Sequence, residues 1–196
     1  MKNIDFWFSI GSTYTYLAIS RLKALEAEHE IGFRMRPFSI RQLMQEQGGN
    51  PFLNNDRKMA YMWRDVERRA AFYGLDAQFP LAYPLDDYER INRIAVMAAD
   101  EGWCFDFALA YYRLWFEEAM PDTPERLQAA LKQAGQNADE VMAAAEGENA
   151  EAAYRTATDK ARSLGLFGVP SFVVDGEVFW GDDRAEDAIR FALLRA

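Results

Sequence analysis

Ser12 is the side chain in this sequence that is best placed for chemistry. It opens the run Ser12-Thr13-Tyr14-Thr15, which follows the apolar stretch 4–8 and precedes apolar positions that recur at helical spacing. At the start of a helix, free N–H groups favour an anion, and a serine O–H can donate a hydrogen bond to a thiolate held there. Serine is also a common helix N-cap, so a thiolate-binding role and a purely capping role are both open.

Val169 and Pro170 form a second feature with chemical meaning. They precede the apolar run 171–174, which Asp175-Gly176 separates from the run 177–180. An Asp-Gly pair between two apolar runs is a strong hairpin signal. A proline at the start of a strand that faces a helix N-terminus is a candidate for a cis peptide bond, and we expect one between Val169 and Pro170.

The elements around these residues predict a fold class. The chain opens with a strand at 4–8, a helix from Tyr14 and a strand at 31–38, which implies a parallel pair with a crossover helix. From about residue 56 to 162 the pattern predicts almost only helix, and the hairpin is followed by a last helix from about Arg184. A β-α-β unit and a β-β-α unit together make the thioredoxin fold.

We therefore expect an α/β protein with a thioredoxin-like fold that is interrupted by a large, all-helical insertion. The thioredoxin-like domain would be discontinuous, at 1–40 and 165–196, and the insertion domain would span 41–164. In redox members of this fold a Cys-x-x-Cys pair begins the first helix, whereas here Ser12 and Thr15 occupy those positions. Thiol–disulfide exchange by the chain itself is excluded, and a thiolate at Ser12 would have to come from another molecule, of which glutathione is the obvious one.

Composition and charge exclude several classes of function. The 22 Lys and Arg residues face 31 Asp and Glu, a formal net charge of −9, so no concentrated basic surface for nucleic acid is expected. The sequence has no secretory signal pattern and no apolar run near ~18 residues, which predicts a cytoplasmic protein without a membrane span. One histidine and one cysteine, Cys104, provide no zinc or nucleophilic-triad spacing, and the apolar neighbours of Cys104 predict a buried side chain.

The stretch Phe6-Trp7-Phe8-Ser9-Ile10-Gly11-Ser12-Thr13-Tyr14-Thr15-Tyr16-Leu17-Ala18 resembles the opening of a known family. This is the DsbA-like 2-hydroxychromene-2-carboxylate isomerase family, close kin of the kappa-class glutathione transferases. Thr13 stands where members commonly have proline and Ser9 where they have aspartate, which bears on the substrate more than on the fold. Further matches run in the family's order to about residue 187: Gly49-Asn50-Pro51, Lys58 with Tyr61, Phe167-Gly168-Val169-Pro170-Ser171-Phe172, and Phe179-Trp180-Gly181-Asp182-Asp183-Arg184.

The resemblance implies glutathione as the cofactor and a catalytic role for Ser12, whose hydroxyl would hold the glutathione sulfur. The backbone of Val169, before Pro170, would pair with the cysteinyl N–H and C=O of glutathione, as an added strand does. No metal site is expected.

Four further binding residues follow from the same resemblance. Asn50 and Lys58 would contact the glycyl end of glutathione and the substrate, and Asp182 and Asp183 would bind the γ-glutamyl ammonium group. Each has a simpler interpretation that stays open: a left-handed loop residue for Asn50, a solvated helix charge for Lys58, and caps of the last helix for the two aspartates.

The function that the resemblance implies is a glutathione-dependent isomerase, which converts 2-hydroxychromene-2-carboxylate to trans-o-hydroxybenzylidenepyruvate or acts on a related aromatic catabolite. One alternative is a kappa-class-like glutathione transferase, which consumes glutathione on an electrophile. Another is a non-catalytic thioredoxin-fold protein that binds peptides or acts like a chaperone. The expected partner is a small aromatic keto acid or electrophile, and the family also implies a homodimer.

Overall fold

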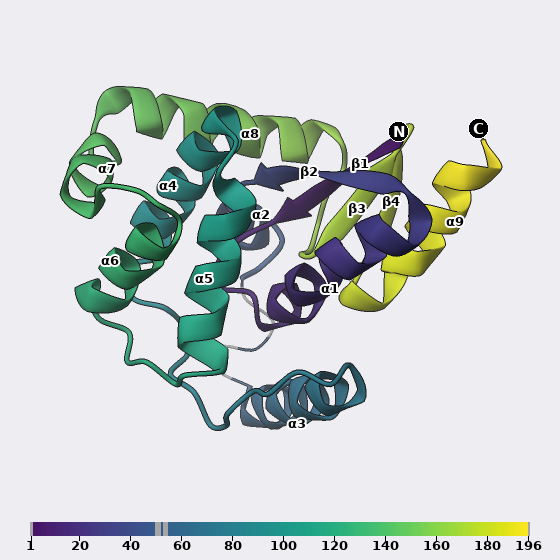
Figure 1. Ribbon diagram of the computed structural model, residues 1–196, viewed down its shortest axis with the longest axis horizontal. Coiled ribbons are helices and arrows are strands. Elements are labelled where there is room, and N and C mark those ends of the chain that lie inside the picture. Colours follow the sequence, from purple (N-terminus) through teal and green to yellow (C-terminus); the bar gives the residue numbers. More distant parts are fainter. Residues whose placement is uncertain (1, 50–51, 53–54, 196) are drawn as a thin grey trace.

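A four-stranded sheet lies beside a block of helices in the computed structural model, which describes residues 2–49, 52 and 55–195 (Figure 1). The strand order is β2-β1-β3-β4. Strand β1 runs parallel to β2 and antiparallel to β3, and β3 and β4 form the antiparallel hairpin. This mixed sheet confirms the expected thioredoxin-like fold. The strands are β1 (Lys2–Phe8), β2 (Ile31–Pro37), β3 (Ser171–Val174) and β4 (Glu177–Trp180).

Two groups of helices accompany the sheet. Helices α1 (Thr13–His29) and α9 (Ala185–Leu194) belong to the two ends of the chain, and the 3-10 turn η1 (Asp182–Arg184) leads into α9. No helix among the described residues is long and apolar enough to cross a membrane. The helices between β2 and β3 are α2 (Ile40–Glu46), α3 (Asp56–Phe72), α4 (Tyr88–Glu101), α5 (Cys104–Phe116), α6 (Pro124–Gln133), α7 (Ala138–Ala144) and α8 (Glu148–Ser163).

Strand β1 is buried on both faces of the sheet. Phe6 and Phe8 lie in a core cluster with residues of α1 and α9, and the Phe6 ring is 5.2 Å from the ring of Phe172 in β3. Trp7 points the other way, into a second cluster with residues of α2 and α8, where its ring is 5.8 Å from that of Phe38. Because both faces are covered at this end of the strand, its last three residues, 6–8, are continuously apolar instead of alternating.

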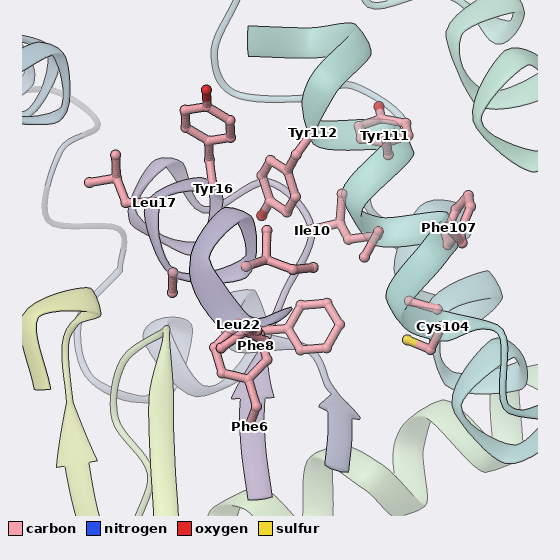
Figure 2. Packing of buried hydrophobic residues seen from close by; sticks show 14 of the residues in the cluster. Phe6, Phe8, Ile10, Tyr16, Leu17, Leu22, Cys104, Phe107, Tyr111 and Tyr112 are labelled. Atoms are coloured by element: carbon pink, nitrogen blue, oxygen red, sulfur yellow. The ribbon is translucent and has the colours of Figure 1, made fainter. Parts of the chain in front are cut away.

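Helix α5 shares the larger core with the sheet. Figure 2 shows Tyr112 of α5 pointing toward α1 beside Ile10, with Phe6 and Phe8 of β1 below. The rings of Tyr16 in α1 and Phe116 in α5 stack 4.2 Å apart. The helices between β2 and β3 are therefore packed directly against the sheet-bearing half, and the division into two domains at 41–164 stays a prediction.

Local signals explain where several elements begin. Ser12, Ser39 and Asn137 cap α1, α2 and α7, each accepting a backbone N–H three residues on. Asp175 (φ 51°) and Gly176 (φ 85°) both adopt the left-handed conformation that a two-residue type I′ hairpin requires.

One expectation for the helical region is wrong. Residues 73–87 are not helical, although the pattern was expected to be almost only helix from 56 to 162. Pro80 and Pro84 have no N–H to donate and clash with a preceding helical turn, so a helix cannot run through them. This segment carries Tyr83, Pro84 and Leu85 past the start of α1 toward α4, and Tyr83 and Pro84 line the cleft described next.

Candidate active site

A cleft of about 890 Å³ lies where the N-terminus of α1 meets α2, α3 and the segment before β3. Five of the seven residues singled out by the sequence line it: Ser12, Lys58, Val169, Asp182 and Asp183. Pro170 is buried directly after Val169, and Asn50 lies outside the described residues. The fold thus brings both ends of the chain and the first turn of α3 to one cavity.

Ser12 stands at the junction of α1 and Val169. Its Oγ accepts the N–H of Thr15 at 3.3 Å and donates its proton to the carbonyl oxygen of Val169 at 3.4 Å. The first turn of α1 carries no acidic residue, so nothing there offsets the positive end of the helix. The bond to Val169 is long, and the Ser12 O–H can turn from it toward an anion in the cleft.

The backbone of Val169 is shaped to receive an extended chain. The Val169–Pro170 peptide bond is cis, as expected. The Val169 carbonyl faces Ser12, and its N–H donates no hydrogen bond to any residue in the described part of the chain. A neighbouring donor and acceptor on one residue can pair with a peptide in the manner of an added strand.

Asp182 is held by α3. Its Oδ2 accepts hydrogen bonds from Nε of Arg69 at 3.0 Å, from Nη2 of Arg69 at 2.6 Å and from the Tyr73 hydroxyl at 3.2 Å. Its side chain is only 3% exposed. Burial raises the pKa of Asp182 above its ordinary value, and the hydrogen bonds and charge of Arg69 counter this shift. Asp182 thus already has a cationic partner within the chain.

Asp183 is more accessible than Asp182 at the same rim. Its carboxylate pairs with Arg184 at 2.7 Å, and its side chain is 42% exposed. The hydrogen bond from Arg184 lowers the pKa of Asp183 below its ordinary value, so this side chain is ionised at neutral pH. Of the two neighbouring carboxylates, Asp183 is the more exposed one, and its ion pair with Arg184 lies at the surface, where a cationic ligand group can also reach the carboxylate.

One face of α3 lines the cleft with Lys58, Tyr61, Asp65 and Arg69. Their spacing of three, four and four residues places them along a single helix face. Lys58 and its neighbour Arg57 are exposed cations without an ion pair to any described residue. Asp65 accepts a hydrogen bond from the Tyr14 hydroxyl at 3.0 Å, and burial together with Asp65 raises the pKa of Tyr14.

Sequence reasoning missed Arg69, Asp65 and Arg57. The helical spacing from Lys58 to Arg69 was a signal that could have identified a polar face on α3. It could not have shown that Arg69 meets Asp182, which lies 113 residues further along the chain. Taken together, the cleft can stabilise an anion at Ser12, pair with an extended backbone at Val169 and attract charged groups at its rim.

Comparisons with known proteins find relatives that match nearly the whole chain. The chain is 29% identical over 188 residues to the 2-hydroxychromene-2-carboxylate isomerase of Sphingobium xenophagum, covering 94% of this chain and 95% of that protein. It is 23% identical over 206 residues to glutathione S-transferase kappa 1 of Caenorhabditis elegans, covering 94% and 88%. A solved structure of 2-hydroxychromene-2-carboxylate isomerase superposes with a TM-score of 0.83 at 22% identity, covering 98% of this chain and 95% of the other.

A family sequence model for the DSBA-like thioredoxin domain matches residues 3–190. That range begins in β1 and ends within α9, so it includes all four strands and both sides of the cleft. The chain therefore belongs to the DSBA-like thioredoxin domain family.

Proposed function

We propose that this chain is a glutathione-dependent isomerase that converts 2-hydroxychromene-2-carboxylate to trans-o-hydroxybenzylidenepyruvate, or that acts on a related aromatic keto acid. The observation that carries the proposal is the meeting of the Ser12 hydroxyl, the positive end of α1 and the Val169 backbone in one cleft. Nearly full-length similarity to a protein named for this isomerisation supports the choice of reaction.

The cleft fits glutathione by the chemistry of its groups. The Val169 N–H, which has no partner among the described residues, and the Val169 carbonyl suit the cysteinyl backbone, and the ionised Asp183 suits the γ-glutamyl ammonium. Lys58 also lines the cleft, where it would meet the glycyl carboxylate or the carboxylate of the substrate. Asp182, whose Oδ2 is paired with Arg69, would hold the rim in place beside Asp183.

Bound glutathione would supply a nucleophilic thiolate that adds to the substrate reversibly and is not consumed. The chain would stabilise that thiolate at neutral pH with the Ser12 O–H and the N-terminus of α1. Four aromatic residues that line the cleft, Phe52, Tyr61, Tyr83 and Trp180, would bind the aromatic ring of the substrate.

Calorimetric titration with glutathione tests the proposal directly. Saturable binding to the wild type that Asp183→Ala weakens by about tenfold, the cost of one lost charge-assisted contact, is the expected result. Asp175→Asn removes a carboxylate outside the cleft and keeps a residue that tolerates the left-handed conformation of the hairpin turn, so it is the matched control. If the wild-type protein does not bind glutathione, the proposal of a glutathione-dependent reaction is wrong.

A glutathione transferase is the second candidate, favoured by the similarity to a kappa glutathione S-transferase. The two reactions differ in mass balance. Measuring glutathione before and after many turnovers separates them, because the isomerase leaves its concentration unchanged and the transferase lowers it by one molecule per product.

A further inference from the structure

The loop that presents Ser12 is held by side chains from the helices between β2 and β3. Asn92 of α4 accepts the N–H of Ile10 with Oδ1 at 2.8 Å and donates from Nδ2 to the carbonyl oxygen of Ile10 at 2.8 Å. Asn92 is completely buried. One amide therefore pairs with both backbone groups of a single loop residue, as a neighbouring strand would.

Tyr112 of α5 reaches the same loop from the other side. Its hydroxyl oxygen accepts the N–H of Gly11 at 3.3 Å and lies 3.1 Å and 3.0 Å from the carbonyl oxygens of Ser9 and Ser12, to which its one proton can be donated. Figure 2 shows the Tyr112 side chain pointing from α5 toward α1 beside Ile10. Complete burial raises the pKa of Tyr112, so its hydroxyl stays protonated and able to donate.

The ring of Tyr88 limits where the loop can lie. Gly11 has φ 119°, and a Cβ atom on it would come within 3.0 Å of Cδ2 of Tyr88. The Tyr88 hydroxyl in turn accepts the N–H of Ile40 at 3.1 Å at the start of α2. Every residue from Ser9 to Ser12 is thus in contact with a side chain that comes from α4 or α5.

We propose that Tyr112 and Asn92 are positioning residues that place the Ser12 hydroxyl for a bound thiolate, so that the helices between β2 and β3 control the reactivity of the sulfur. This inference rests on the proposed glutathione site. The Ser12 contacts to Thr15 and Val169, at 3.3 Å and 3.4 Å, are long, so a small displacement of the loop changes what its O–H can reach.

Tyr112→Phe is the test variant, because it removes one hydroxyl and keeps the packing of the ring. Tyr111→Phe is its matched control: the neighbouring side chain in α5 is also buried, and its hydroxyl accepts a hydrogen bond from Arg126 at 2.9 Å, away from the loop. The charged groups of the cleft, including Arg41, Lys58 and Asp183, are unchanged in both variants.

Two titrations are measured on each protein. The pKa of bound glutathione is followed by the ultraviolet absorbance of its thiolate, and binding of S-methylglutathione, which has no ionisable thiol, is followed by calorimetry. In Tyr112→Phe the acid dissociation constant of the bound thiol should fall roughly three- to tenfold, the range that one hydrogen bond contributes. S-methylglutathione binding should stay within twofold of wild type, and Tyr111→Phe should match wild type in both.

An unchanged thiol pKa in Tyr112→Phe would overturn the inference and leave the glutathione site intact. Equal losses of S-methylglutathione binding and thiolate in Tyr112→Phe would also overturn it, because the hydroxyl would then support only the general structure of the cleft. Failure of the wild type to bind either ligand is a different result, which would remove the proposed function itself. Asn92→Ser, which keeps a hydrogen-bonding side chain, should raise the thiol pKa in the same direction as Tyr112→Phe.

Discussion

The two sides of the cleft are built differently. On the Ser12 side, the loop and its partners Asn92 and Tyr112 are buried or half-buried and joined by direct hydrogen bonds. On the α3 side, Lys58 and Arg57 are exposed, and Tyr61 is 61% exposed. Fixed donors suit a group that must be held in one geometry, whereas long exposed side chains suit ligands that vary. If the proposed function holds, the end of the site that binds the sulfur is preorganised, and the end that binds the substrate is adaptable.

Removing the Ser12 hydroxyl should have the largest effect on activity. Ser12→Gly is preferred over Ser12→Ala because glycine is an acceptable N-cap and costs only a few tenths of a kcal/mol, against about 1 kcal/mol for alanine. We expect kcat/KM for the isomerisation to fall about 100-fold, as for loss of one preorganised donor. Steady-state kinetics check the loss of activity, and urea unfolding of the same preparation checks the small change in stability. The Ser12→Thr variant, which keeps the hydroxyl, should retain most of the activity.

Breaking the pair between Arg69 and Asp182 should have the largest effect on stability. Arg69→Met leaves a buried carboxylate with Tyr73 alone and should lower the free energy of unfolding by about 3 kcal/mol at neutral pH. Arg68→Met is the control, since Arg68 is half exposed and its surface pair with Asp65 is worth less than about 1 kcal/mol, with one further exposed contact to the Tyr61 ring.

The destabilisation of Arg69→Met should depend on pH. Burial already raises the folded-state pKa of Asp182 above its ordinary value, and loss of Arg69 raises it further. A group with a raised folded-state pKa contributes most to stability below its unfolded-state pKa and loses that contribution as the pH rises through the folded-state value. The difference between variant and wild type should therefore shrink on acidification, and urea unfolding that shows a growing difference would contradict this account.

Lys58→Gln should have a smaller effect, and one that salt reduces. An exposed cation contributes modestly to binding, so we expect glutathione or substrate affinity to fall about fivefold at low ionic strength and less in about 0.5 M salt. Arg64→Gln, on the same helix but outside the lining of the cleft, should leave affinity unchanged. An effect of Lys58→Gln that is independent of salt would mean that the α3 side is as preorganised as the Ser12 side.

Replacing Cys104 should have the smallest effect on activity, although Cys104 belongs to the same core as the Ser12 side. It is buried in α5, as the sequence predicted, and burial raises the pKa of its thiol. We expect no reaction with a thiol reagent in the folded protein and one reactive thiol per chain in denaturant. The Cys104→Ala variant should keep its activity. A loss of turnover in this variant would mean that the packing of the core around Cys104 affects the reaction.

Local signals predicted the strands, the caps and the hairpin, because each depends on neighbouring residues. Ser12 capped α1 and Asp175-Gly176 formed the turn for reasons that lie within four positions of the chain. The segment 73–87 departs from the predicted helical region because Pro80 and Pro84 interrupt a helix there.

The partners of the site residues could not be predicted in this way. Arg69 and Asp182 are separated by 113 positions, and Asn92 and Ile10 by 82. Nothing in the residues around Asn92 distinguishes it from a solvated helix side chain, and only the packing of α4 against the loop before α1 reveals its role. The roles given to Ser12, Val169, Lys58 and Asp183 remain predictions that the variants above can test.

The sheet takes two strands from each end of the chain, and this has a consequence for biosynthesis. Strand β3 pairs directly with β1, and the Ser12 and Val169 contact joins residues 157 positions apart. A nascent chain of about 165 residues already contains α1 through α8, but the free edge of β1 and the side chains of Phe6 and Trp7 still lack their β3 and α9 neighbours. The ribosome must therefore release nearly the whole polypeptide before the sheet can close, and until then an unpaired apolar strand is exposed to aggregation or to chaperones.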